Sequence, residues 1–375
     1  MRLITESRTS LLDDLLNRVC IELEITKTQR ENAETTYHAV GKWLAGEGSP
    51  LVKMNPNIYA QGSLRIDTTV KPKGNSEFDL DLVCEFSSQP TNSNPLATLK
   101  MIETRLREHG TYTNMVEPKK RCIRLNYAGN YHMDILPAYP DPRLHDGCLL
   151  VPDREAREWK ESAPKIFASW FEQCCQHKLF LEKSASIEPF PDYDLPQDKP
   201  TLKRIVQLIK RYRDVKYKDN PALAPISVVL TTLAGMVYEG TYCVSEGIGL
   251  MLRRIKADIP TNDRIRVLNP SNTAEDFSEK WDNDPDLYSE FLNWIDGFLS
   301  DWNRLQSLQS NTEVADELKK LFGEEVAMPA MEKHAAYMEH LRESGKLGVS
   351  KSSIMLTGIT SPSSVAIGKN TFYGR

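Results

Sequence analysis

Two aspartates separated by one residue, Asp79 and Asp81, are the side chains of this chain best suited to chemistry. They lie within FDLDLV, an alternating apolar run that predicts a β-strand. Side chains two residues apart on a strand project from the same face, so we expect these carboxylates side by side. Carboxylates that close repel one another unless a cation lies between them. Because magnesium is typically bound by one or two carboxylates together with substrate phosphates, the pair indicates a metal-dependent site for a nucleoside triphosphate.

A third aspartate and a Gly-Ser pair complete this predicted site. Residues 121–127 and 131–136, joined by a short glycine-containing turn, predict a β-hairpin with Asp134 in its second strand. If that strand neighbours the first, three carboxylates gather, and such a set can hold two ions about 3.5–4 Å apart. Gly62 and Ser63 can cradle phosphate oxygens, because a turn glycine lets the backbone approach closely and the serine hydroxyl adds a donor.

Each of these features also has a purely structural interpretation. A D-x-D pair can be a solvated face or the charge that protects an edge strand, and a lone Gly-Ser pair is uninformative. In combination, a Gly-Ser turn, an apolar strand with D-x-D and a hairpin strand with one aspartate form the pattern of the polymerase-β-like nucleotidyltransferases.

Longer stretches resemble one branch of that superfamily. QGSLRIDTTVKP, EFDLDLV and MDILP are similar to the CD-NTase family, the cyclic-oligonucleotide synthases of bacterial antiphage defence, whose animal relatives are cyclic GMP-AMP synthase and oligoadenylate synthase. The similarity continues in LKRIVQLIKRYRD, APISVVLTTLAG and LNPSNTAEDFSEKW, and covers about residues 25–305. Asp276 stands where many relatives are expected to carry asparagine, so we assign that position no role.

The resemblance implies an α+β fold: a polymerase-β-like nucleotidyltransferase lobe with a mixed sheet and flanking helices, then a helical C-terminal lobe. We expect the catalytic lobe with its N-terminal helices over residues 1–137, a crossing segment over 138–198, the helical lobe over 199–344 and a mobile tail over 345–375. In some defence operons a ligase-like companion conjugates the synthase through its C-terminus. The Gly-Arg ending permits such a partner, as it permits a tail without a role.

The same resemblance implies two Mg²⁺ or Mn²⁺ ions, held by Asp79, Asp81 and Asp134. A ribose hydroxyl would attack the α-phosphate of ATP or GTP and release pyrophosphate, and a second round would close a cyclic di- or trinucleotide. The expected nucleotide-binding residues are Gln61, Gly62, Ser63, Lys203, Lys210 and Ser227.

The residues of this set in the helical lobe have competing interpretations. Lys203 and Lys210 lie seven residues apart on one predicted helix, hence on nearly the same face. They form either a solvated basic face or a clamp on the triphosphate; the resemblance favours one lysine, and we prefer Lys203. Ser227, in a first helical turn, lies where an anion binds well, but it can equally be a cap. Arg65 can pair with an acid or contact phosphate.

Composition restricts the remaining choices. A net charge of −5 over 375 residues argues against a protein that coats nucleic acid, so we expect no nucleic-acid activator. No apolar run reaches the roughly 18–20 residues of a membrane span, and the N-terminus lacks a signal peptide's apolar core. Seven cysteines without regular spacing fit a reducing cytoplasm.

Two other functions stay open: a template-independent transferase that makes linear oligonucleotides, and a catalytically inert fold that binds a nucleotide or scaffolds partners. The sequence does not reveal the bases, the linkage or the ring size. Apolar periodicity predicts helices at residues 10–24, 26–44, 96–109, near 153–180, 202–214, from 225, from 285, 312–322 and 328–343.

Overall fold

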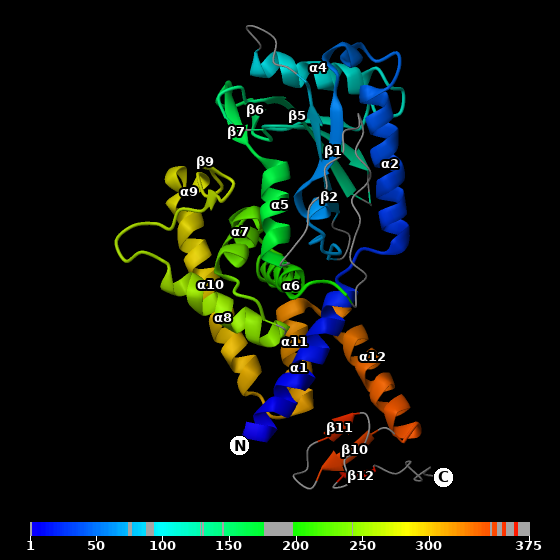
Figure 1. The fold of residues 1–375 in the computed structure, drawn as a ribbon, viewed down its shortest axis with the longest axis vertical. Helices are drawn as coiled ribbons and strands as arrows, with labels where there is room; N and C mark the ends of the chain where they lie inside the picture. Colours follow the sequence, from blue (N-terminus) through cyan, green and yellow to red (C-terminus); the bar gives the residue numbers. More distant parts are fainter. Residues whose placement is uncertain are drawn as a thin grey trace.

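The computed structural model describes residues 2–73, 77–87, 94–127, 129, 131–144, 146–175, 198–241, 243–345, 347–350, 355–357 and 364–366. Figure 1 shows two lobes: a sheet flanked by helices above, and a group of helices below. Within the described residues, no helix is both long and apolar enough to cross a membrane.

The two N-terminal helices belong to different lobes. α1 (Arg2–Glu22) buries Leu16 and Val19 in the core of the helical lobe. α2 (Lys27–Ala45) starts at a capping box, in which Thr26 and Gln29 satisfy each other's backbone donors. It packs beside the sheet, as Figure 1 shows.

The sheet of the upper lobe brings the expected catalytic strands together. Its main path runs β1-β2-β5-β4-β3, with β2 and β5 parallel and the other neighbours antiparallel. Alternate residues of β2 (Phe78–Glu85), starting with Phe78, are buried in the core between the sheet and the helices α2 and α4 (Pro95–Arg107). The predicted alternation is therefore confirmed. The other strands of this path are β1 (Asn57–Gln61), β3 (Val116–Pro118), β4 (Ile123–Tyr127) and β5 (Tyr131–Pro140).

The helix expected near residues 153–180 is wrong in its first part. There β6 (Leu149–Asp153) and β7 (Glu158–Ser162) form a hairpin that extends the sheet from β5. The helix of this region, α5 (Pro164–Cys175), starts only after that hairpin, at a proline suited to a first helical turn. Pairing of the two strands outweighs the weak local preference of EWKES for a helix.

Helices build the lower lobe around a core of aromatic side chains. Trp294, Phe298 and Trp302 are buried, and the Phe298 ring stacks on Tyr212 with centroids 3.9 Å apart, so these aromatic side chains form core packing. The helices are α6 (Thr201–Lys216), α7 (Ser227–Val237), α8 (Val244–Ala257), α9 (Lys280–Asn283), α10 (Pro285–Ser307), α11 (Asn311–Phe322) and α12 (Glu324–Glu343).

Short elements complete the described part of the chain. One-turn helices lie at Pro50–Met54 (η1), Gly62–Arg65 (α3) and Pro221–Leu223 (η2), and β8 (Leu268–Asn269) pairs with β9 (Asn272–Asp276). Within the segment expected to be a mobile tail, the structure describes three strands, β10 (Leu347–Ser350), β11 (Met355–Thr357) and β12 (Ser364–Ala366). The rest of that tail lies outside the described residues.

Candidate active site

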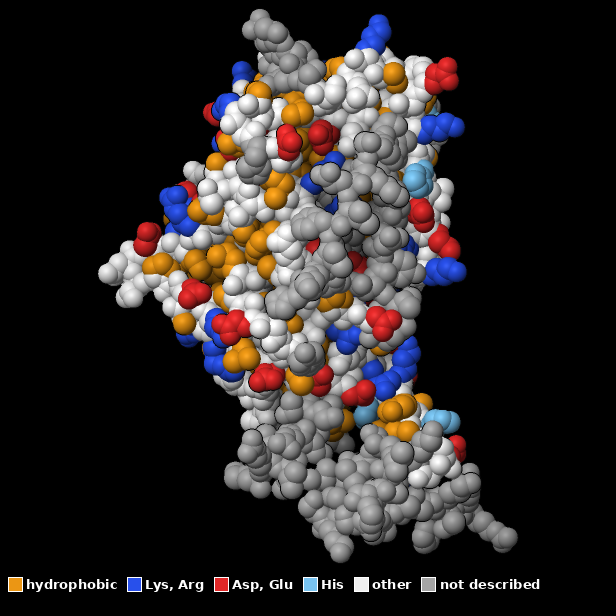
Figure 2. Space-filling model, viewed as in Figure 1, with side chains coloured by type: hydrophobic (Ala, Val, Ile, Leu, Met, Phe, Trp, Pro, Cys, Tyr) orange, Lys and Arg blue, Asp and Glu red, His pale blue; other side chains and the backbone are white. Residues whose placement is uncertain are grey.

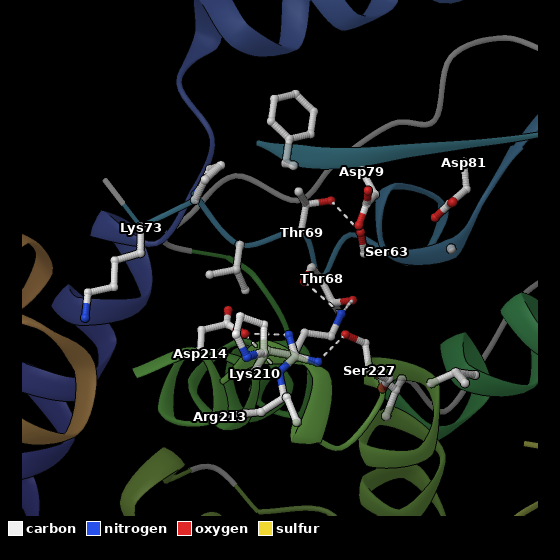
Figure 3. A pocket seen from close by; sticks show the side chains of 18 of the residues that line it. Ser63, Thr68, Thr69, Lys73, Asp79, Asp81, Lys210, Arg213, Asp214 and Ser227 are labelled. Carbon is white, nitrogen blue, oxygen red and sulfur yellow. Dashed lines mark hydrogen bonds and ion pairs between the residues drawn. The ribbon is translucent and has the colours of Figure 1, made fainter. Parts of the chain in front are cut away.

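The strand register places the three predicted acids on neighbouring strands. β2 and β5 run parallel, with Asp81 directly beside Asp134 and Asp79 beside His132. The apolar residues of β2 fill the core, so Asp79 and Asp81 project from the opposite face, towards the helical lobe (Figure 3). The expected neighbourhood of the two strands is confirmed.

The guanidinium of Arg124 lies between two of these acids, Asp134 and Asp79. Arg124 on β4 pairs directly opposite Asp134 in the hairpin. Its Nε and Nη2 each donate to a carboxylate oxygen of Asp134 at 2.7 Å, and Nη2 lies 3.5 Å from Asp79 Oδ1. These hydrogen bonds raise the pKa of Arg124. The sequence analysis missed Arg124, although the hairpin register follows from its central turn: if Tyr127 faces Tyr131, residue 124 faces residue 134.

The surroundings of Asp81 raise the pKa of its carboxyl group strongly. Burial, followed by the charges of Asp79 and Asp134, raises its pKa to about 7. Burial also raises the pKa of Asp79, although Arg124 opposes the shift. Burial is thus the first cause of both shifts, and at Asp81 the neighbouring carboxylates add to it. Hard carboxylate oxygens crowded in this way suit a divalent cation.

The side chains of the three acids do not converge on one point in this structure. Among the residues that the structure describes, no three His, Cys, Asp or Glu side chains form a group that could hold a metal. Asp134 instead directs both carboxylate oxygens towards Arg124. A metal site that used all three acids would therefore require Asp134 to leave that guanidinium; the three already lie on adjacent strands of one sheet.

Gly62 permits the close approach of the turn to Asp81. Its φ of 63° lies in the left-handed region that favours glycine. A Cβ on Gly62 would stand 2.2 Å from Asp81 Oδ2, far inside van der Waals contact. Ser63 follows in the cleft, where its hydroxyl accepts a hydrogen bond from Thr69 Oγ1 at 3.2 Å. Gln61 ends β1 beside Asp81 but does not line the cleft.

A cleft of about 620 Å³ separates Asp79 and Asp81 from a cationic wall, and Asp134 is not part of its lining. Figure 3 shows Asp79, Asp81 and Ser63 on the sheet side, with Lys210 and Ser227 facing them from α6 and α7. Other charged residues of this lining are Lys73, Glu77, Arg213, Asp214 and Lys218. Carboxylates on one wall and ammonium, guanidinium and hydroxyl groups on the other can hold metal ions and a triphosphate at the same time.

The structure brings Lys210 to the cleft, and not Lys203. Lys210 Nζ donates to the Thr68 carbonyl at 3.1 Å and to Thr68 Oγ1 at 2.9 Å. Burial, and then the charge of Arg213, lowers the pKa of Lys210 to about 7. Lys203 is absent from the cleft lining, and its Nζ lies 2.8 Å from Glu172 Oε1 on α5. The geometry therefore favours the lysine that the sequence analysis ranked second.

Arg213 is a second cation of this wall that the sequence analysis missed. It donates to Ser227 Oγ at 2.6 Å and to Asp214 Oδ1 at 2.6 Å. It lies three residues after Lys210, a spacing that puts both side chains on neighbouring positions of one helix face. That spacing was a usable signal in the sequence.

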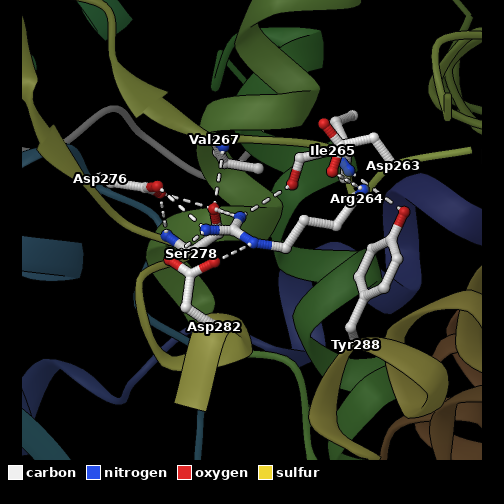
Figure 4. Close-up of polar contacts among 8 residues, drawn as sticks. All are labelled: Asp263, Arg264, Ile265, Val267, Asp276, Ser278, Asp282 and Tyr288. Atoms are coloured by element: carbon white, nitrogen blue, oxygen red, sulfur yellow. Dashed lines mark hydrogen bonds and ion pairs between the residues drawn. The ribbon is translucent and has the colours of Figure 1, made fainter. Parts of the chain in front are cut away.

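Two further residues of the sequence analysis lie away from the cleft. Arg65 is not part of the cleft lining. Asp276 belongs to a polar cluster around Arg264 (Figure 4), where it accepts a hydrogen bond from the Ser278 amide at 2.7 Å. Arg264 also pairs with Asp282, with Nη2 and Oδ2 2.6 Å apart. These contacts give Asp276 a structural role in the segment after β9.

Comparisons with known proteins agree with this geometry. Residues 11–174 match the Second Messenger Oligonucleotide or Dinucleotide Synthetase domain. A c-di-GMP synthase of Roseivirga ehrenbergii is 33% identical over 99% of this chain and 100% of its own length. The cyclic dinucleotide synthase CdnG of Bradyrhizobium diazoefficiens is 26% identical over 72% of this chain and 70% of its own.

A solved structure shows the same fold. The CD-NTase CdnG of Bradyrhizobium diazoefficiens, in complex with GTP, superposes with a TM-score of 0.70 at 22% identity and covers 86% of this chain and 98% of that one. The expected α+β architecture is thereby confirmed. Polymerase-β-like nucleotidyltransferases are generally metal-dependent. With one-third identity to a full-length relative, this chain belongs to the CD-NTase family, the nucleotidyltransferases that synthesise cyclic-oligonucleotide second messengers.

Proposed function

We propose that this enzyme joins two molecules of GTP into cyclic di-GMP and releases two molecules of pyrophosphate. The choice of base is supported by the relative named a c-di-GMP synthase, which matches the chain from end to end. The chemistry is supported chiefly by the cleft, in which carboxylates of the sheet face cations of the helical lobe.

The acids provide the reacting end of this cleft. Asp79, Asp81 and Asp134 would hold two Mg²⁺ ions, which, when bound, lower the pKa of the attacking hydroxyl and neutralise charge on the phosphates. Until then, Arg124 holds Asp134 in place through two hydrogen bonds. Asp134, once free of that guanidinium, accepts the proton of the attacking ribose hydroxyl.

The opposite wall binds the triphosphate. Ser63 and the backbone of Gly62 hold phosphate oxygens from the sheet side, and Lys210 and Ser227 hold them from the helical side. Arg213 keeps the Ser227 hydroxyl in place through their 2.6 Å hydrogen bond. Catalysis is then mostly positioning and neutralisation of charge. The linear intermediate returns to the same acids for the second transfer, which closes the ring.

The test is incubation of purified protein with labelled GTP, with ATP, and with both, in Mg²⁺, Mn²⁺ or EDTA. We expect a phosphatase-resistant product from GTP alone that requires the metal. The Asp79→Ala/Asp81→Ala variant should make none, whereas Asp282→Asn, which removes a carboxylate outside the cleft, should act as the wild type. A phosphatase-sensitive product would support the linear transferase instead, and absence of pyrophosphate would support an inert binder.

The biological setting belongs to the same proposal. From the family resemblance we infer a cytoplasmic enzyme whose product signals in antiphage defence, with a ligase-like partner acting on residues 345–375. Plating of phage on cells that carry the complete operon, with wild-type or Asp79→Ala/Asp81→Ala enzyme, tests the first point. Mass spectrometry of the protein from those cells tests the second, since conjugation adds the mass of the partner group to the last peptide.

A further inference from the structure

The loop after the Gly-Ser turn is held by side chains of the other lobe. The carbonyl oxygens of residues 67–69 each accept a hydrogen bond from a buried side chain on α6 or immediately before it. The donors are Lys199 Nζ to residue 67 at 3.2 Å, Lys210 Nζ to residue 68 at 3.1 Å and Gln207 Nε2 to residue 69 at 2.9 Å. Three successive backbone groups of the catalytic lobe thus depend on the helical lobe for their partners.

Glu24, between α1 and α2, ties two of these donors together. Its Oε1 lies 2.6 Å from Lys199 Nζ and accepts a hydrogen bond from Gln207 Nε2 at 3.0 Å. Gln207 is fully buried, and its Oε1 has no hydrogen-bond partner among the described residues, so this amide acts through its donors. Buried polar groups cost free energy unless they are paired, and a paired network at an interface specifies a single arrangement.

The same loop supports the phosphate-binding serine. Thr69 Oγ1 donates to Ser63 Oγ at 3.2 Å, and the Thr68 amide donates to the Ser63 carbonyl at 2.9 Å. Asp67 adopts a φ of 51°, a left-handed conformation that costs a non-glycine residue free energy. The loop therefore needs external contacts to keep this shape, and α6 with its flanking residue supplies them.

We infer that Gln207, Glu24 and Lys199 are positioning residues that fix the loop of residues 67–69, and through it Ser63, in the geometry that nucleotidyl transfer requires. None of the three lines the cleft, so each acts through the backbone that it holds. The inference rests on the proposed function. It adds that the phosphate-binding turn takes its active geometry only when the helical lobe is packed against it.

The first test replaces Gln207 by methionine, which has a similar volume and no donor. At a temperature well below the midpoint of unfolding, we expect kcat/KM for GTP to fall by about 10- to 100-fold, the scale of a misplacement near 1 Å, with a several-fold rise in KM. Loss of folded protein alone would lower the maximal rate and leave KM unchanged. The control is Gln306→Met, the same substitution at an exposed glutamine whose Nε2 donates to the Ser245 carbonyl at 3.4 Å within the helical lobe. Its kinetics should equal those of the wild type.

A charge swap separates positioning from stability. Gln207→Glu alone puts a carboxylate against Glu24 and should lower both the unfolding temperature and the activity. Adding Glu24→Gln restores an amide–carboxylate pair but removes the carboxylate that lies 2.6 Å from Lys199 Nζ, so the unfolding temperature should recover in part. The low kcat/KM should persist, because residue 207 still has no donor for the Thr69 carbonyl.

Two results would overturn the inference. One is recovery of kcat/KM together with the unfolding temperature in the double variant, and the other is unchanged kinetics in Gln207→Met. Both require a wild-type enzyme that turns over GTP, which is measured first. If the wild type releases no pyrophosphate, the proposed function fails, and binding of a fluorescent GTP analogue to the wild type and Gln207→Met then tests the positioning of the loop directly.

Discussion

Replacement of Asp81 by asparagine should stabilise the metal-free protein while it abolishes the reaction. In the folded chain, burial and the neighbouring charges of Asp79 and Asp134 raise the pKa of Asp81 from 3.8 to about 7. In the unfolded chain the same carboxyl ionises near its ordinary value. Folding at neutral pH therefore either ionises Asp81 in an unfavourable place or keeps its proton, and both cost free energy.

The sign and size follow from linkage. Between pH 4 and 7 the folded state binds the proton of Asp81 more tightly than the unfolded state does, so wild-type stability falls as the pH rises through this window and levels off above it. A pKa difference of this size corresponds to on the order of 4 kcal/mol. The pKa of about 7 already includes the favourable charges of Arg124 and Lys210. The value is a ceiling because a buried asparagine amide also costs free energy unless it is hydrogen-bonded. The gain from Asp81→Asn should be near zero at pH 4 and greatest at pH 8.

The assay is denaturant unfolding of both proteins in EDTA across this pH range, repeated with Mg²⁺. We expect Mg²⁺ to stabilise the wild type and to have little effect on Asp81→Asn. Glu85→Gln is the control, because Glu85 lies on the same strand 3.7 Å from Lys165 and away from the cleft. An Asp81→Asn variant that is less stable than the wild type at pH 8 in EDTA would refute the reasoning and assign Asp81 a structural role.

Four further substitutions test the site. Gly62→Ala should reduce kcat at least about 100-fold and lower the unfolding temperature, since its Cβ would stand 2.2 Å from Asp81 Oδ2 at a φ of 63°; wild-type turnover would contradict this geometry. Lys210→Ala should raise KM for GTP at least about tenfold, the scale of a lost charged hydrogen bond. Lys203→Ala should leave KM within about twofold of the wild-type value. The reverse order would identify Lys203 as the lysine that contacts the triphosphate. Arg124→Met should lower the unfolding temperature in EDTA, because it leaves the carboxylates without the neighbouring guanidinium. It should also increase the stabilisation by Mg²⁺, measured by thermal unfolding. Equal unfolding temperatures of the variant and the wild type in EDTA would show that Arg124 does not neutralise these carboxylates.

Local pattern was sufficient to predict that the three carboxylates lie on neighbouring strands. The alternation of FDLDLV determines which face of β2 is buried, and this in turn sends Asp79 and Asp81 to the other face. The hairpin around Gly129 determines the strand of Asp134. These features depend on side-chain period and turn chemistry, which neighbouring residues control. The family resemblance then supplied the order of the lobes.

Features that depend on packing between distant segments were not predictable in this way. Lys203 and Lys210 share a helix face because seven residues span nearly two turns. Which of them meets the cleft depends on where α6 lies against the sheet and α5, and the helix sequence does not contain that information. The strand β7 was missed for a similar reason, since its partner β6, and not its own residues, selects the extended conformation.

The position of α1 has a consequence for how this enzyme can be divided. The matched synthetase domain ends at residue 174. The apolar face of α1, with Leu15, Leu16 and Val19, nevertheless packs in the helical core against α8 and α12, which both come later in the chain. A fragment cut at that boundary would expose this face to water and would be prone to aggregate. The catalytic sheet is therefore not a portable module: exchange between relatives, or fusion to another protein, has to carry both ends of the polypeptide together.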